Sequence, residues 1–291
     1  MKKLAYCFSV VSFLVFLFSC NDNKLLQNNI TEFSIPCDSS TLIPGYMHSN
    51  ALNYYFANWD TVKKISNLSE LNEFIIVNRA FFNNVSGWIV DADITNIDSV
   101  IIDIFLTSTN NRTRLLQLYD SLTISSIWQN TLLTAEKNFI TSVMQYFNTD
   151  FSNKTNIYVF NSFIQYSDSL KQIWNTISWP NDSVNSGSLS GNFLNILKNS
   201  AEFWKDKKLT GPDTTVANPN EPNPCLTMLQ ADAAGYLVHW SKACYDEIKQ
   251  NGKLDEANSE KRMRKAWEGA CKASFLKGLR VSANKYDENY N

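Results

Sequence analysis

Residues able to carry out acid–base or metal chemistry are few and scattered in this sequence. There are 2 histidines, His48 and His239, and no paired spacing joins them to other metal ligands. The run 187–191 reads Gly-Ser-Leu-Ser-Gly, which puts leucine where the serine of a Gly-x-Ser-x-Gly nucleophile turn would stand. We therefore interpret this run as a flexible loop.

Paired carboxylates give no stronger indication of catalysis. Asp91 lies near Asp93, and Asp246 precedes Glu247, but neither pair has the apolar sequence setting that raises a carboxyl pKa for acid catalysis. The sequence predicts no catalytic residue, no cofactor site and no metal site. It favours a protein that is not an enzyme, with a hydrolase of unrecognised residues as an alternative.

Cys20 is the residue for which the sequence does predict a chemical role. Two lysines at positions 2 and 3 precede the apolar run 4–19, LAYCFSVVSFLVFLFS, which is shorter than the roughly 20 residues of a spanning helix. This pattern is typical of a cleaved signal peptide. Its end, Leu-Phe-Ser-Cys, resembles the lipobox of bacterial lipoproteins, in which a small residue precedes a cysteine that accepts diacylglycerol. The resemblance implies a lipid bilayer as partner through acylated Cys20. An ordinary secretory signal or an uncleaved anchor are the alternatives.

Cleavage before Cys20 changes the charge and the set of free thiols. The mature chain has 272 residues, and its net charge falls from −2 to −4 because Lys2 and Lys3 are lost. Cys37, Cys225, Cys244 and Cys271 then remain free to pair in three ways. Helical geometry disfavours a bridge between Cys244 and Cys271. A disulfide between Cys37 and Cys225 is a candidate, because each follows a proline in a predicted loop; small buried thiols are the alternative.

Composition and periodicity predict a folded, all-α chain. Hydrophobic residues make up 44%, and the near balance of charge excludes a nucleic-acid binder that relies on a basic surplus. Apolar residues recur at helical spacing, with boundaries rich in Asn, Ser, Gly and Pro. We expect an antiparallel helical bundle followed by a C-terminal helical hairpin. The six predicted helical stripes cover about 71–85, 97–105, 115–122, 134–147, 155–178 and 193–204.

Five segments follow from these patterns. The lipoprotein signal peptide covers 1–19, and a polar tether covers 20–45. A helical domain is expected over 46–208, a Pro-rich loop over 209–224, and the helical hairpin with its tail over 225–291. Charge changes sign near the end of the chain, from −7 over 21–241 to +3 over 242–291.

Small residues repeat at four-residue spacing in the predicted hairpin. Ala231 and Gly235 mark its first helix, and the second helix carries Ala266, Ala270 and Ser274 with Gly269 and Ala273. Such spacing lets two helix backbones approach closely. A membrane-inserting hairpin is one interpretation, but Asp232, His239 and the charged run 260–265 would be costly in hydrocarbon. A tight hairpin outside the membrane is favoured.

Three short motifs resemble those of uncharacterised exported lipoproteins of Bacteroidota. They are Gly45-Tyr46-Met47-His48-Ser49-Asn50, Ser200-Ala201-Glu202-Phe203-Trp204 and Ala231-Asp232-Ala233-Ala234-Gly235. The first is similar to a Gly-x-x-His-Asn start, although Ser49 separates the histidine from the asparagine. The third opens the hairpin, but charged residues replace the glycine-rich run that usually follows. The resemblance implies architecture and compartment and no particular activity.

Two further features have a functional and a structural interpretation. His48, near the start of a predicted helix, is either a ligand or pH-sensing contact, or a residue bonded to backbone or to a neighbouring helix. Aromatic residues at 54–56 and 59 are either a platform for a sugar or peptide, or part of the core. We favour the structural interpretation of both.

The sequence therefore predicts a membrane-anchored lipoprotein of the cell envelope, in the outer membrane, that binds another envelope protein and performs no catalysis. An antibacterial or membrane-active protein acting through the C-terminal hairpin is the main alternative.

Overall fold

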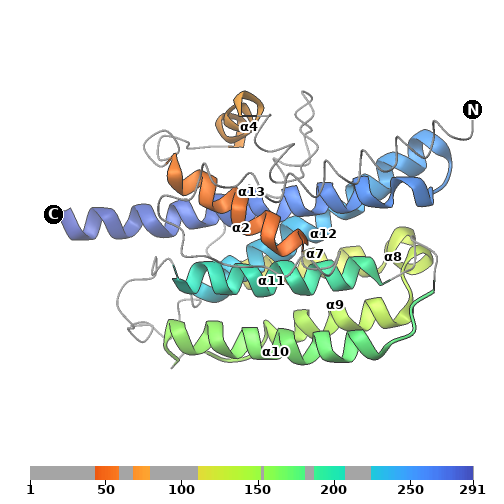
Figure 1. Cartoon of the computed structure of the whole chain (residues 1–291), viewed down its shortest axis with the longest axis horizontal. Helices are drawn as coiled ribbons and strands as arrows, with labels where there is room; N and C mark the ends of the chain where they lie inside the picture. The colour runs from red at the N-terminus through yellow and green to blue at the C-terminus, as the bar shows by residue number, and fades with distance from the viewer. Residues whose placement is uncertain are drawn as a thin grey trace, which may run out of the picture. The chain divides into compact units, whose positions relative to one another are not determined.

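The computed structural model describes residues 43–58, 68–78, 111–151, 154–180, 187–206 and 224–290 (Figure 1). The chain divides into two compact units, Met1–Ser39 and Ser40–Asn291, and every described residue belongs to the second. The described residues form helices and turns and contain no strand. This confirms the predicted all-α class.

The described part of the chain begins with two helices. Helix α2 covers Ile43–Ala57 and begins earlier than the predicted start at 46, and α4 covers Leu68–Val77. The Tyr54 hydroxyl donates to Asn78 Oδ1 at 2.6 Å, which joins the two helices. Tyr54 thus packs between helices, while Trp59 and the predicted stripe 97–105 lie outside the described residues.

Four helices follow, and local caps set several of their ends. They are α7 (Asn111–Thr123), α8 (Ser126–Thr131), α9 (Thr134–Tyr146) and α10 (Asn156–Thr176). The side chains of Ser125 and Thr155 accept from the backbone N–H groups of Trp128 and Tyr158, each at 3.2 Å, and so cap α8 and α10. The short helix α8 has no counterpart among the predicted stripes.

Three long helices complete the chain. Helix α11 covers Ser188–Asp206, α12 covers Pro224–Asn251, and α13 covers Ser259–Tyr290 after the 3₁₀ turn η2 (Glu256–Asn258). The start of α11 corrects the prediction of a flexible loop at 187–191: Gly187 takes a φ of +76°, and the helix begins at the next residue. Glycine adopts this left-handed backbone readily, so the run is a helix start.

Helix α11 packs against helices from both ends of the described chain. It contacts α2, α9, α10 and α12, so helices on both sides of the Pro-rich segment share one core. Lys198 bonds Asp168 of α10 at 2.6 Å, and the Trp204 indole donates to Ser274 of α13 at 3.0 Å. The most deeply buried large side chains include Trp204, Tyr236, Phe160, Phe163 and Phe193.

Helices α12 and α13 lie side by side and form the predicted hairpin (Figure 1). Gly235 and Gly269 face each other across a close contact of the two backbones. A Cβ atom built on Gly235 would overlap the carbonyl group of Gly269, and one on Gly269 would overlap the Gly235 carbonyl oxygen and the His239 ring. The small-residue spacing therefore produces close backbone packing between these helices.

Several described charged side chains in the hairpin are paired within the protein. Glu268 lies 2.6 Å from the Lys272 ammonium and 3.4 Å from that of Lys265, and Glu268 and Lys272 are both buried. None of the described helices combines the length and the apolar character needed to cross a bilayer.

Replacing Gly235 by alanine should destabilise the protein although alanine favours a helix. The added methyl group would push the two backbones apart, and overpacking typically costs about 1–3 kcal/mol, more than the roughly 1 kcal/mol that alanine gains in helix propensity. Urea denaturation followed by circular dichroism would measure the change. Gln250→Ala, at an exposed position of the same helix, is the control and should stay within about 0.5 kcal/mol of the wild type. A G235A variant as stable as Q250A would contradict the packing argument.

Candidate functional site

A buried polar centre joins three helices that are far apart in the sequence. His48 Nε2 of α2 lies 3.0 Å from Asp232 Oδ1 of α12, and the Ser200 hydroxyl of α11 donates to Asp232 Oδ2. All three side chains have an exposed fraction of 0%. Each carboxyl oxygen of Asp232 therefore accepts one hydrogen bond from a different helix.

The order of these groups decides what chemistry they can do. In a nucleophile–base arrangement, the serine hydroxyl bonds the imidazole and the carboxylate orients the imidazole from its other side. Here the carboxylate lies between the serine and the histidine, so the imidazole accepts no proton from Ser200. The geometry supports a connection between helices and provides no activated nucleophile.

The imidazole of His48 is held in one orientation. When Asp232 is ionised, Nε2 donates in this bond, because a carboxylate only accepts. Nδ1 is buried and has no hydrogen-bond partner within the described part of the chain. The main-chain oxygen of His48 accepts from the Cys271 thiol of α13 at 3.7 Å, which brings a fourth helix to the centre. Burial, followed by the charges of Asp232 and Glu268, raises the pKa of the Cys271 thiol well above its ordinary value.

Glycines one turn away from His48 and Asp232 lie at close contacts between helices. A Cβ on Gly45, three residues before His48, would overlap the Asn199 side chain and lie 2.9 Å from the Asn195 carbonyl oxygen of α11. Gly235, three residues after Asp232, fits against Gly269 of α13. Gly45 thus permits close packing of α2 on α11, and Gly235 permits close packing of α12 on α13.

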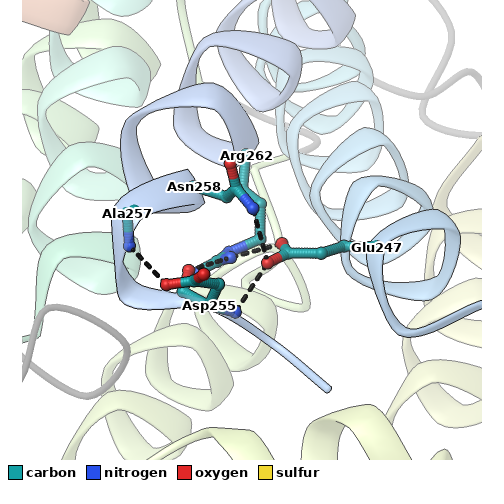
Figure 2. Close-up of polar contacts among 5 residues, drawn as sticks. All are labelled: Glu247, Asp255, Ala257, Asn258 and Arg262. Atoms are coloured by element: carbon teal, nitrogen blue, oxygen red, sulfur yellow. Dashed lines mark hydrogen bonds and ion pairs between the residues drawn. The ribbon is translucent and has the colours of Figure 1, made fainter. Parts of the chain in front are cut away.

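A second polar network fixes the turn between α12 and α13 (Figure 2). The Glu247 carboxylate accepts from the Arg262 guanidinium at 2.5 Å, from the Asp255 backbone N–H at 2.6 Å and from the Asn258 amide at 3.1 Å. Asp255 in turn caps η2 by accepting from the Ala257 backbone N–H at 3.0 Å.

The charge state of Glu247 follows from these contacts. Burial alone would raise its pKa, but the hydrogen bonds from Asp255, Asn258 and Arg262, together with the Arg262 charge, hold the pKa below its ordinary value. Gly252, with a φ of +75°, ends α12 just before this network. The network therefore orders the turn between α12 and α13. Its groups are not arranged as a catalytic site.

The predicted cysteine sites fall mostly outside the described residues. Cys20 and Cys37 lie outside them, and Cys225 is the second residue of α12. Cys244 and Cys271 are free and buried. A disulfide between Cys37 and Cys225 stays a prediction. Within the described helices, no group of three or more His, Cys, Asp or Glu side chains is arranged to hold a metal ion.

Sequence reasoning named His48, Ser200 and Asp232 in three separate motifs but did not predict that they meet. Asp232 was interpreted only as a charge unsuited to hydrocarbon. The signal that could have joined them is the buried setting of a charged residue among Ala231, Ala233 and Ala234, because a carboxylate in such a setting needs hydrogen-bond donors from elsewhere in the chain. Comparison with known proteins adds no further assignment: no family model, curated protein or solved structure matches the chain.

Removing the Asp232 carboxylate should strongly destabilise the fold. Asp232→Ala leaves His48 and Ser200 buried without their acceptor, and each unsatisfied buried donor costs about 1–3 kcal/mol. Urea denaturation would measure the loss. Asp246→Ala is a matched control on the same helix, because Asp246 makes a partly exposed ion pair with Lys242 at 2.9 Å and should cost about 1 kcal/mol or less. Equal losses for the two variants would show that the buried centre does not hold the helices together.

Proposed function

We propose that this chain is an exported lipoprotein, anchored to the outer membrane through acylated Cys20, whose helical unit binds another protein of the cell envelope. The observation that carries the proposal is the N-terminal sequence: two lysines, an apolar run over 4–19 and the Ser19-Cys20 junction. Acylation with two or more chains gives stable attachment to a bilayer.

The length of chain between the anchor and the first described helix supports a role in reaching a partner. Residues 21–42 separate Cys20 from α2. A chain of this length can span at most about 70–80 Å. A helical unit attached in this way can meet a partner at some distance from the lipid headgroups.

The outward face of α10 is the part of the described surface that best fits a protein partner. It exposes Ile157, Tyr158 and Ile173, three of the six large hydrophobic residues exposed among the described residues. Gln165 and Ser169 are also exposed on this helix. Protein interfaces use aromatic and apolar contacts at their centres, so these exposed side chains support binding to a partner surface that is also apolar.

The buried centre supports binding rather than chemistry at the described residues. Its Ser200 and His48 atoms have no solvent exposure, and the two side chains are joined through Asp232 rather than to each other. A substrate would have to separate α2, α11 and α12 to reach them.

Lipid attachment is tested by Cys20→Ala in cells of a Gram-negative expression host. The wild type should incorporate labelled palmitate and fractionate with membranes, whereas the variant should take up no label because the residue directly after the signal then has no thiol. Cys37→Ala is the control and should keep both the label and the membrane fraction. A C20A variant that incorporates label like the wild type, or a wild type that takes up none, would overturn the anchor.

Partner binding is tested by site-specific photo-crosslinking in intact cells. A crosslinking residue at Gln165, on the outward face of α10, should give one reproducible protein adduct. The same residue at Gln250, exposed at the end of α12, should give none. Adducts at Gln250 but not at Gln165 would contradict the assignment to α10. Turnover of a substrate by the purified protein, with no adduct at either position, would contradict the binding function.

A further inference from the structure

The first turn of α11 is held by side chains from three other helices. Glu136 of α9 accepts from the backbone N–H groups of Leu189 and Ser190. The Tyr236 hydroxyl of α12 donates to the Leu189 carbonyl oxygen at 3.1 Å. The Trp174 indole of α10 donates to the Gly187 carbonyl oxygen at 3.2 Å and to Ser190 Oγ at 3.1 Å. This turn is therefore the meeting point of α9, α10, α11 and α12.

Glu136 is the carboxylic acid of this group, and its carboxyl group is poorly solvated. Its exposed fraction is 1%, and one carboxyl oxygen, Oε2, has no hydrogen-bond partner within the described chain. The backbone N–H groups that it accepts from belong to Leu133, Leu189 and Ser190. A buried carboxylate that bonds only backbone N–H groups and keeps one oxygen unbonded is stabilised less than one that also bonds a cation. Its protonated form is therefore favoured.

Other ionisable groups at this turn do not neutralise Glu136. Tyr236 faces it from α12, and burial, followed by the charge of Glu136, raises the pKa of the Tyr236 phenol well above its ordinary value. Lys171 approaches the same end of α11 from α10, but its ammonium lies over the Trp174 ring, 3.6 Å from the centroid. Burial lowers the pKa of Lys171 to about 8. On α11 itself, the contacts to Glu136 come from backbone N–H groups.

We propose that Glu136 makes the first turn of α11 a proton-sensitive latch: when the carboxyl group is protonated the turn stays packed against α9, and when it is ionised the turn opens more often. This property is independent of the partner binding proposed above.

The direction of the effect follows from proton linkage. Burial raises the pKa of Glu136 from 4.5 to about 7 in the packed state, against the opposing hydrogen bonds from Ser190, Leu189 and Leu133. An opened turn exposes the carboxyl group and returns its pKa to the ordinary value, so the opened state releases its proton first. The equilibrium constant for opening of the turn is therefore constant below pH about 4.5, rises as the pH increases to about 7, and levels off above that. This constant rises roughly 300-fold over the whole range, and roughly 70-fold between pH 5 and pH 8.

Hydrogen exchange on the full chain in detergent micelles tests the latch. After correction for the intrinsic pH dependence of exchange, amides over 134–147 and 188–195 of the wild type should open roughly 70-fold more at pH 8 than at pH 5. In Glu136→Gln, which keeps the side-chain shape but cannot ionise, the same amides should lose this rise in opening with pH. Amides over 226–250 of α12 serve as the internal reference and should change little in either protein.

Glu73→Gln, an exposed position on α4, is the matched control and should behave like the wild type. Identical pH dependence in the wild type and E136Q would overturn the proposal. So would an increase of equal size at all helices, because it would indicate global unfolding rather than a local latch.

Discussion

Burial of the Asp232 carboxyl group constrains how α2 and α11 pack against α12. Burying an isolated charge away from solvent costs several kcal/mol, and hydrogen-bond donors from other helices must compensate this cost. His48 and Ser200 supply these donors, so α2 and α11 pack against α12 in the register that brings both side chains to Asp232. The hydrophobic core would tolerate several ways of stacking such helices, whereas the two hydrogen bonds accept one register.

The small residues set close backbone contacts near this centre. A Cβ at Gly45 would hold α2 away from α11, and a Cβ at Gly235 would hold α12 away from α13. Trp204, one turn after Ser200 on α11, is buried and bonds Ser274 of α13. A stripe of small residues alone predicts only that two helices are close. The hydrogen bonds of Asp232 add that α2 and α11 also meet α12.

Periodicity predicted the helical class and most of the long helices, because apolar stripes at helical spacing reflect burial directly. It missed α8, whose buried residues Ile127 and Trp128 are too few to make a stripe. It also misread the start of α11 at 187–191, because a glycine with positive φ and two serines are equally common in loops and at helix ends. The polar centre could not be predicted by spacing, since contacts separated by 184 and 32 residues depend on how the helices pack.

Buried carboxyl groups in this fold differ in how far hydrogen-bond donors compensate the loss of solvent. Glu247 bonds a guanidinium, an amide and a backbone N–H, and its pKa falls. Asp232 bonds a histidine and a serine from two other helices. Glu136 accepts from backbone N–H groups and keeps one oxygen unbonded, and its pKa rises to about 7. Backbone donors lower the pKa of both Glu247 and Glu136, but at Glu136 the loss of solvent outweighs them. Ionisation of Glu136 therefore opposes the packing around it.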